Sequence, residues 1–270
     1  MPILEFQHVN KVYNNSTKAL DDVSFSVEKG EFVSIIGPSG AGKSTILRCI
    51  NRLIDATDGN IIYDGDDILS LGKRDLRRVR TKTGMIFQHY NLVDRLSVIE
   101  NVLHGRLGQK SAISGMLGSY SETEKEKAFS ILNELGLAEQ AYKRCDALSG
   151  GQKQLLNLAS IMAMHPDMLI LDEPTSQLDP IAASDFLETV KKINRDLGTT
   201  IILTEHRLEE VFPSADRVVV MDEGQILCVG TPPEIGEELK KRNHEMFLAM
   251  PVPMQVYAKV ESEQPCPITV

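Results

Sequence analysis

The segment GPSGAGKST, which begins at Gly37, has the composition and spacing of a phosphate-binding loop. Gly37, Gly40 and Gly42 stand where the backbone must come close to phosphate oxygens, so that consecutive N–H groups form a concave anion site at the start of a helix. Lys43 would then reach the β- and γ-phosphates of a nucleotide, and Ser44 would supply a hydroxyl to Mg²⁺. The apolar run FVSII directly before the loop predicts the buried strand that such a loop requires.

A second glycine-rich segment, LSGGQ at 148–152, has the spacing of a helix start. Ser149 and Gln152 form a capping-box pair, so this segment is predicted to open a helix whose free N–H groups can hold an anion. A plain glycine-rich helix start would explain LSGGQ on its own. A chain with one complete phosphate loop, however, needs no second anion site for the same nucleotide, so this site would serve the ATP of another molecule. The two motifs therefore predict a head-to-tail pair of subunits with two ATP molecules between them, each contacted by Lys43 of one chain and Ser149 of the other.

The composition limits the classes of protein to which the chain can belong. Its 270 residues suffice for one large domain, or for one domain with a subdomain. The net charge of −9 argues against a nucleic-acid partner, because proteins that bind the phosphate backbone usually carry a basic face, although a local basic patch is compatible with this charge. The apolar runs are too short to span a bilayer and the first residues lack a signal-peptide pattern, so we expect a soluble, cytosolic protein. The cysteines are widely scattered without a CxxC pair, which indicates neither a zinc site nor a disulfide framework.

Short apolar runs rich in β-branched residues recur along the chain and predict buried strands at 32–36, 84–87, 168–171, 200–204 and 217–221. Helical patterns separate several of them, including those at 43–53 and 182–197, as in a mostly parallel sheet with helices on both faces. The alternation of apolar and polar residues over 3–27 and 59–64 instead predicts a small antiparallel sheet beside this core.

Strand-like runs are absent between residues 88 and 160. Capping-box spacings at Ser97 and Ser121 predict helices there, and the stretch 105–120, rich in Gly and Ser, predicts an exposed loop or irregular arm. A charged stretch at 237–245 predicts another helix. We therefore expect an ATP-binding core with the antiparallel sheet, a helical subdomain, and a C-terminal helix with an irregular tail. The core would comprise 1–87 with 161–235, the helical subdomain 88–160, and the C-terminal helix and tail 236–270.

The order of the motifs GPSGAGKST, LSGGQ and LILDEP resembles that of the ATP-binding cassette (ABC) family of transporter ATPases, and the resemblance covers nearly the whole chain. It implies an α/β fold of the P-loop NTPase (RecA-like) type, with a mostly parallel sheet core, a small antiparallel β subdomain and an inserted α-helical subdomain. It also implies that ATP and Mg²⁺ are the cofactors, and that ATP hydrolysis by a homodimer drives transport through an integral membrane permease. The chain would then be cytoplasmic and peripheral on the inner face of the cell membrane.

The resemblance also implies roles for four residues outside the glycine-rich motifs. Asp172 is similar to the acidic residue that holds Mg²⁺ through its water shell, and Glu173 to the base that orients and deprotonates the attacking water. Gln88 resembles the residue that senses the γ-phosphate and the metal and links the core to the membrane partner. His206 resembles the switch histidine that contacts the γ-phosphate. Taken alone, Gln88 would indicate nothing, and a lone histidine is most often a satisfied surface or core group.

Further contacts follow from the same resemblance. Tyr13 resembles the aromatic residue that stacks on adenine, although a tyrosine near a strand end more often serves packing. Asp179, in the segment SQLD, resembles an aspartate of the dimer contact. The other expected nucleotide contacts are Gly37, Ser39, Gly40, Ala41, Gly42, Lys43, Ser44 and Thr45 in the first motif, and Ser149, Gly150, Gly151 and Gln152 in the second. The expected metal-site residues are Ser44, Gln88 and Asp172.

The chain departs from the common family pattern near these residues. LSGGQ is followed by KQLLNLA, in which the usual basic residue is replaced, and Gln177 stands where a small residue is common. Glu205 and Arg207 flank His206, where Thr and Asp are usual. These changes leave the chemistry intact but can alter the hydrolysis rate and the dimer contacts.

The two halves resemble different subfamilies. Up to about residue 147, the segments INRLI and GMIFQHYNLVDRLSVIENVLHGRLG are similar to the ATPase of phosphonate importers. Beyond it, LNLASIMAMHPDMLILDEPTSQLDP, TEHRLEE and HEMFLAMPVPMQVYAKVE are similar to energy-coupling-factor ATPases of the cobalt- and vitamin-uptake type. We therefore hypothesise a chimera joined near LSGGQ. A phosphonate-type permease is the favoured partner, because the helical subdomain and Gln88 face the membrane subunit in this family.

Other classes of protein share part of this pattern. A small-molecule or nucleoside kinase would use GxxxxGK but gives no reason for LSGGQ. A non-transport cassette ATPase of DNA repair or translation would dimerise similarly, yet such proteins usually bring a long coiled coil or a second cassette. A chimeric or orphan ATPase would lack a permease of its own. The transported solute is not encoded in this chain, because the permease and any binding protein select it.

Overall fold

The computed structural model describes residues 1–14, 16–88, 90–109, 120–205, 208–242 and 245–249. Its larger sheet has the strand order β10 (Gln225–Gly230), β9 (Arg217–Asp222), β3 (Phe32–Ile36), β8 (Thr200–Thr204), β7 (Met168–Asp172) and β6 (Thr83–Ile86). Neighbouring strands from β9 to β6 run parallel, and β10 pairs antiparallel with β9. The parallel core of the sheet confirms the predicted α/β class.

Strands β3, β7 and β8 are buried at every position, which explains why their sequences are continuous apolar runs. Successive side chains of a strand point to opposite faces. In β7, Ile170 belongs to the hydrophobic cluster that includes α1 (Lys43–Ile50), whereas Leu169 and Leu171 belong to the cluster with α6 (Gly150–Met162) and α7 (Pro180–Leu197). The sheet is therefore covered by helices on both faces.

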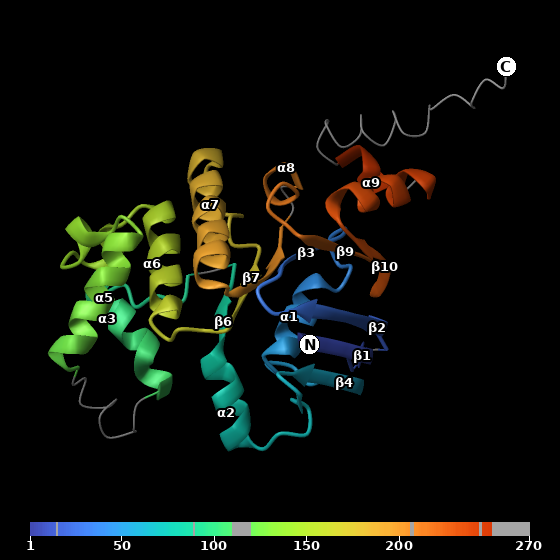
Figure 1. Ribbon diagram of the computed structural model, residues 1–270, viewed down its shortest axis with the longest axis horizontal. Coiled ribbons are helices and arrows are strands. Elements are labelled where there is room, and N and C mark those ends of the chain that lie inside the picture. Colours follow the sequence, from blue (N-terminus) through green and yellow to red (C-terminus); the bar gives the residue numbers. More distant parts are fainter. Residues whose placement is uncertain (15, 89, 110–119, 206–207, 243–244, 250–270) are drawn as a thin grey trace.

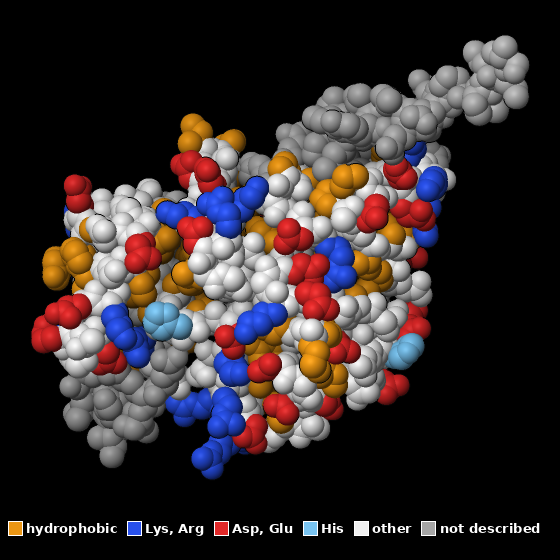
Figure 2. Space-filling model, viewed as in Figure 1, with side chains coloured by type: hydrophobic (Ala, Val, Ile, Leu, Met, Phe, Trp, Pro, Cys, Tyr) orange, Lys and Arg blue, Asp and Glu red, His pale blue; other side chains and the backbone are white. Residues whose placement is uncertain are grey.

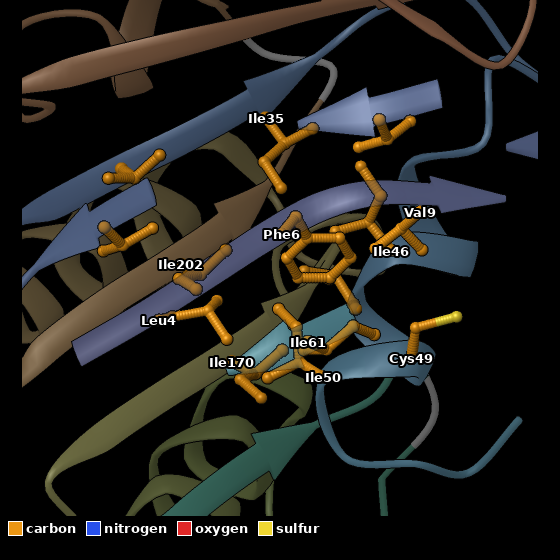
Figure 3. Packing of buried hydrophobic residues seen from close by; sticks show 14 of the residues in the cluster. Leu4, Phe6, Val9, Ile35, Ile46, Cys49, Ile50, Ile61, Ile170 and Ile202 are labelled. Atoms are coloured by element: carbon orange, nitrogen blue, oxygen red, sulfur yellow. The ribbon is translucent and has the colours of Figure 1, made fainter. Parts of the chain in front are cut away.

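The smaller sheet is antiparallel and has the order β2 (Lys18–Glu28), β1 (Pro2–Val12), β4 (Asp58–Tyr63) and β5 (Asp66–Asp67), as the alternating pattern predicted. Figure 3 shows Phe6 of β1, Ile46 of α1 and Ile202 of β8 pointing into one cluster. Helix α1 thus packs against both sheets, so the position of the loop that precedes it depends on both.

Helices occupy most of the chain between β6 and β7. Those that the structure describes are α3 (Val98–Gly105), η1 (Arg106–Gln109), α5 (Glu122–Glu134), η2 (Ala138–Gln140), η3 (Cys145–Ala147) and α6. Complete capping boxes at Ser97, Ser121 and Ser149 open the three α-helices, as their spacing predicted. Figure 1 shows these helices gathered at one end of the molecule, with β1, β2 and β4 at the opposite end.

Outside that segment, the helices among the described residues are also α2 (Lys73–Lys82), α8 (Leu208–Val211), α9 (Pro232–Lys241) and η4 (Glu245–Ala249). Helix α1 ends at Ile50 rather than at residue 53, because the chain turns at once and Arg52 takes a φ of 47°. The helix expected at 237–245 begins earlier, at the capping box of Thr231 and Glu234, and ends at Lys241. In the predicted arm at 105–120, Gly105 ends α3 and 106–109 form η1, while 110–119 lie outside the described residues.

Charges of both signs are interspersed over the face that Figure 2 shows, with Lys and Arg side chains gathered at its lower edge, where Figure 1 places α2. This is the local basic patch that the net charge allowed. The basic residues of α2 are Lys73, Arg74, Arg77, Arg78, Arg80 and Lys82. Within the described ranges, no helix has the length and apolar composition needed to cross a bilayer.

Candidate functional site

The glycine-rich loop joins β3 to α1, and two of its glycines are required by close contacts. A Cβ atom on Gly37 would lie 2.3 Å from the carbonyl oxygen of Met221, and one on Gly42 would lie 2.5 Å from that of Ala19. Gly42 also takes a φ of 100°, which other residues rarely adopt. It is the N-cap of α1 and provides no side-chain cap, and the first turn carries no acidic residue. No side chain of the cap or of the first turn neutralises this helix start, as is typical of a helix start that binds an anion.

Lys43 lies at the first position of α1 with only 5% of its surface exposed. Its Nζ donates hydrogen bonds to the carbonyl oxygens of Gly37 at 2.8 Å and Pro38 at 2.9 Å. Burial lowers the pKa of the ammonium, while the nearby carboxylates of Glu173 and Asp172 oppose this shift. The cation is therefore held inside the loop that would surround the phosphates, within electrostatic reach of Glu173, the predicted base, and of Asp172, a predicted metal-site residue.

Asp172, the last residue of β7, connects the loop to the centre of the sheet. The Ser44 hydroxyl donates to its Oδ1 at 2.8 Å, and the Thr204 hydroxyl at the end of β8 donates to the same oxygen at 3.0 Å. Hydroxyl and carboxylate oxygens are the ligands that Mg²⁺ prefers, and Mg²⁺ is commonly bound by one or two of them together with waters and substrate phosphates. In the described part of the chain, no cluster of three or more His, Cys, Asp or Glu side chains could hold a metal by protein ligands alone. The Ser44–Asp172 pair therefore fits a magnesium ion that is carried in with a nucleotide.

Glu173 follows Asp172 in a strained conformation, with a φ of 48°. Its backbone N–H donates to both the carbonyl oxygen of Thr204 at 3.0 Å and the Thr204 hydroxyl at 3.1 Å. A left-handed conformation at a glutamate costs energy and persists only where the surroundings determine it, typically at functional sites. Glu173 is half-buried and directly follows the carboxyl end of β7.

The LSGGQ segment forms a second helix start. Ser149 is the N-cap of α6: its Oγ accepts a hydrogen bond from the Gln152 N–H, and its own N–H donates to Oε1 of Gln152. Ser149 and Gly150 are exposed, and the neighbouring Gly151 lies against α7, since a Cβ on it would be 3.2 Å from Cβ of Ala182. Among the described residues, no hydrogen bond or ion pair joins this segment to the loop that holds Lys43. The two glycine-rich segments thus open different helices, α1 and α6, which stand apart in Figure 1.

The remaining predicted residues lie at the edges of these two motifs. Asp179 is the N-cap of α7 and accepts hydrogen bonds from the N–H groups of Ile181 and Ala182. Gln88 is exposed just after β6, and Ser39 and Gly40 are exposed at the tip of the loop, while Ala41 is buried and Thr45 half-buried.

Tyr13 is 41% exposed in the turn between β1 and β2, with the Lys11 ammonium 5.1 Å from its ring centroid. The Ala19 carbonyl at the start of β2 abuts Gly42, so this turn borders the phosphate loop. His206 lies outside the described residues.

Sequence reasoning missed Thr204, which contacts both Asp172 and the Glu173 backbone. It also missed Gln154 and Glu205, which bind the next two residues. The available signal was position alone: Thr204 ends the strand predicted at 200–204, and Glu205 directly follows it.

Three comparisons with known proteins agree with this geometry. A family model described as ABC transporter matches residues 20–176. The "Phosphonates import ATP-binding protein PhnC 2" of Oceanobacillus iheyensis is 47% identical over 230 residues, which cover 85% of this chain and 91% of that protein. The "Phosphonates import ATP-binding protein PhnC" of Treponema denticola is 43% identical over 237 residues, 88% of this chain and 93% of the relative.

Two solved structures extend the similarity to the whole fold. The structure of cbiO1 from Clostridium perfringens, part of the ABC transporter complex cbiONQ, matches with a TM-score of 0.78 and 29% identity, covering 96% of this chain and 99% of that one. The dimeric post-hydrolysis state of the ATP-binding cassette MJ0796 bound to ADP and Pi matches with a TM-score of 0.74 and 30% identity, covering 85% and 98%. Together with the phosphate loop and the acidic end of β7, these matches show that the chain belongs to the ABC transporter family and is one of its ATPases.

Proposed function

We propose that two copies of this chain enclose two ATP molecules and that their hydrolysis drives the import of a phosphonate through an integral membrane permease. The observation that carries the dimer is the separation of the two phosphate-binding motifs within one chain. A second copy turned by a two-fold axis can place its exposed Ser149 helix start over the ATP that Lys43 of the first copy holds. The dimeric MJ0796 cassette supports this arrangement, and the PhnC relatives support the solute.

The proposed chemistry is phosphoryl transfer to water. The N–H groups of the loop and Lys43 stabilise the negative charge on the transferring phosphoryl group, and Glu173 orients the water and accepts its proton. Ser44 and Asp172 would hold Mg²⁺, which would supply positive charge to neutralise the phosphates of the nucleotide. To reach those phosphates, Lys43 exchanges its two bonds to Gly37 and Pro38 for bonds to phosphate oxygens.

The residues at the edges of the site complete this assignment. We propose that Tyr13 stacks on adenine, that Gln88 senses the γ-phosphate and metal, and that His206 contacts the γ-phosphate. Ser39, Gly40, Ala41 and Thr45 belong to the same phosphate loop. Gly150, Gly151, Gln152 and Asp179 lie with Ser149 on the surface that meets the partner copy.

We assign the chain to the inner face of the membrane, in the cytoplasm, with the helical part at 88–160 and Gln88 toward a phosphonate-type permease. The core is assigned to 1–87 with 161–235, and the C-terminal part to 236–270. A nucleic-acid partner is not expected. Retention on a nucleic-acid column at physiological salt would contradict this. The chimera hypothesis stays a prediction, which a segment-by-segment comparison on either side of Ser149 can test.

The closing of the dimer is tested with Glu173→Gln. This variant keeps ATP binding but cannot remove a proton from water, so it should elute as a dimer with Mg-ATP and as a monomer without nucleotide. A hydrolysis-deficient variant that stays monomeric at saturating ATP contradicts the proposal.

The head-to-tail geometry is tested by mixing Lys43→Ala with Ser149→Arg subunits, each inactive alone. In a mixed dimer, one ATP site carries both substitutions and the other carries neither. An equal mixture should therefore regain about a quarter of the wild-type ATPase activity, because half of the dimers are mixed and each has one intact site. No recovery on mixing indicates that both motifs act within one chain and overturns the arrangement.

The solute is tested in the cell that makes this chain. Deleting the chain should abolish uptake of a labelled phosphonate while leaving cobalt uptake unchanged, and Lys43→Ala should fail to restore it. Loss of cobalt uptake with unchanged phosphonate uptake would assign the chain to the other subfamily.

A further inference from the structure

In the turn that follows Glu173, two buried side chains from distant parts of the chain bind the same peptide group. The carbonyl oxygen of Pro174 accepts a hydrogen bond from Nε2 of Gln154 at 2.7 Å. The N–H of the same peptide, which belongs to Thr175, donates to Oε1 of Glu205 at 2.8 Å. Both polar atoms of the Pro174–Thr175 peptide are therefore fixed, and the peptide cannot rotate without breaking one of these bonds.

Both side chains are unusual in being polar and almost fully buried. Gln154 is 1% exposed and Glu205 is 2% exposed. Burying an amide or a carboxylate costs free energy unless hydrogen bonds compensate for the lost water. Glu205 receives a second bond from the Thr175 hydroxyl at 2.6 Å. A small apolar residue would fill either position at less cost if packing were its only role.

The neighbour of this peptide is the strained catalytic candidate. Glu173 takes a φ of 48° immediately before a proline, whose ring further restricts the conformation of the preceding residue. Thr204 fixes the backbone N–H of Glu173, and Gln154 and Glu205 fix the Pro174–Thr175 peptide, which begins one residue later. The left-handed conformation of Glu173 is thus enforced from both sides, and so is the direction of its carboxylate.

We propose that Gln154 and Glu205 are positioning residues that act as a pair through the Pro174–Thr175 peptide to aim the Glu173 carboxylate at the attacking water. This inference rests on the proposed role of Glu173. It also gives a reason for a glutamate at position 205, directly before His206. Because Gln154 lies in the second turn of α6, the Pro174 carbonyl links the helix that starts at Ser149 to the catalytic turn of the same chain.

The test replaces each side chain by methionine, which has a similar length but cannot make the bond. Gln154→Met and Glu205→Met should each lower kcat by about 10- to 100-fold, because misplacement of a catalytic group by a fraction of a bond length has effects of this size. The Kd for ATP, measured with a fluorescent nucleotide, should change less than about threefold, because neither residue touches the phosphate loop. Glu205→Gln keeps an acceptor oxygen for Thr175 and should recover most of the activity.

A matched control separates positioning from loss of stability. Thr83, at the start of β6, donates its hydroxyl to Oδ1 of Asn51 and is 3% exposed, so Thr83→Val also removes a buried hydrogen bond. Thr83 starts β6, and Glu173 follows the end of β7. Because these two strands run parallel, Thr83 and Glu173 lie at opposite ends of the strands. Thr83→Val should lower the melting temperature without a change in kcat greater than about twofold.

The double variant Gln154→Met/Glu205→Met gives the decisive comparison. If both residues fix one peptide, the second substitution should lower kcat by less than about threefold beyond the first, since the peptide is already free. Multiplied effects, or a folded Gln154→Met variant with wild-type kcat, would overturn the inference.

A further variant is available if the methionine variants do not unfold cooperatively. Thr175→Val removes only the hydroxyl bond to Glu205 and should still lower kcat by about threefold at unchanged Kd. An unchanged kcat there also overturns it. Failure of the proposed function is distinguished by a wild-type chain that does not hydrolyse ATP, or by an active Glu173→Gln.

Discussion

Glu173 has a backbone conformation that is unfavourable for any residue with a side chain, so the chain should become more stable when Glu173 is replaced by glycine than when it is replaced by alanine. Both variants lose the carboxylate, and both should be inactive. They differ only at the left-handed backbone with its φ of 48°. The left-handed region costs a residue with a Cβ about 1–2 kcal/mol, while glycine loses about 0.5–1 kcal/mol more chain entropy on folding than alanine. The net difference is about 0.5–1 kcal/mol in favour of Glu173→Gly.

Thermal unfolding without nucleotide is the appropriate assay, because ATP would stabilise whichever variant binds it more tightly. For a chain of this size, the expected difference in Tm is about 1–3 °C. Ser176 provides the matched control in the same turn, since it does not have a positive φ and its hydroxyl bonds the Glu173 carbonyl oxygen. There Ser176→Gly should be less stable than Ser176→Ala by about 0.5–1 kcal/mol. An alanine variant at 173 that is as stable as the glycine variant would refute the idea that strain is stored at this residue.

Three further outcomes are expected. Lys43→Ala should weaken both ATP binding and turnover, which nucleotide titration and phosphate release measure, and unchanged ATP affinity would remove Lys43 from the phosphate site. Gly42→Ala places a Cβ 2.5 Å from the Ala19 carbonyl at a φ of 100°, so it should lower Tm and ATP affinity together, and normal values of both would contradict the geometry of the loop. Burial raises the pKa of the Cys49 thiol to about 12, so alkylation of Cys49 at pH 8 should be limited by the rate of unfolding. The unfolded chain releases the thiol proton above about pH 8.5 while the folded chain retains it, so the free energy of unfolding should decrease as the pH rises from about 8.5 toward 12. Rapid alkylation of Cys49 in the folded chain would show that it is accessible.

The parts of the fold that were predictable depend on interactions between neighbouring residues. The capping boxes at Ser97, Ser121 and Ser149 need only residues three positions apart, and the strands at β3, β7 and β8 need only a continuous apolar run. Helix α2 was missed because its sequence KRDLRRVRTK has almost no apolar stripe, with Val79 as its one buried residue. The helix α9 was placed too late, because its two prolines at the N-terminus were not used as a start signal.

The amino-acid sequence by itself determined which atoms could contact a nucleotide, because the glycines, Lys43 and Ser44 of the loop are adjacent in the chain and their local conformation follows from residue type. It also predicted a helix start at Ser149, which the structure has, and a second anion site there, which stays a prediction. Only the tertiary structure decided that Thr204 meets Asp172 and that Gln154 and Glu205 meet the turn after Glu173. These contacts join residues far apart in sequence. They exist because β8 lies beside β7 and α6 packs against the turn after β7. Burial of the whole core, rather than any local pattern, selects this arrangement.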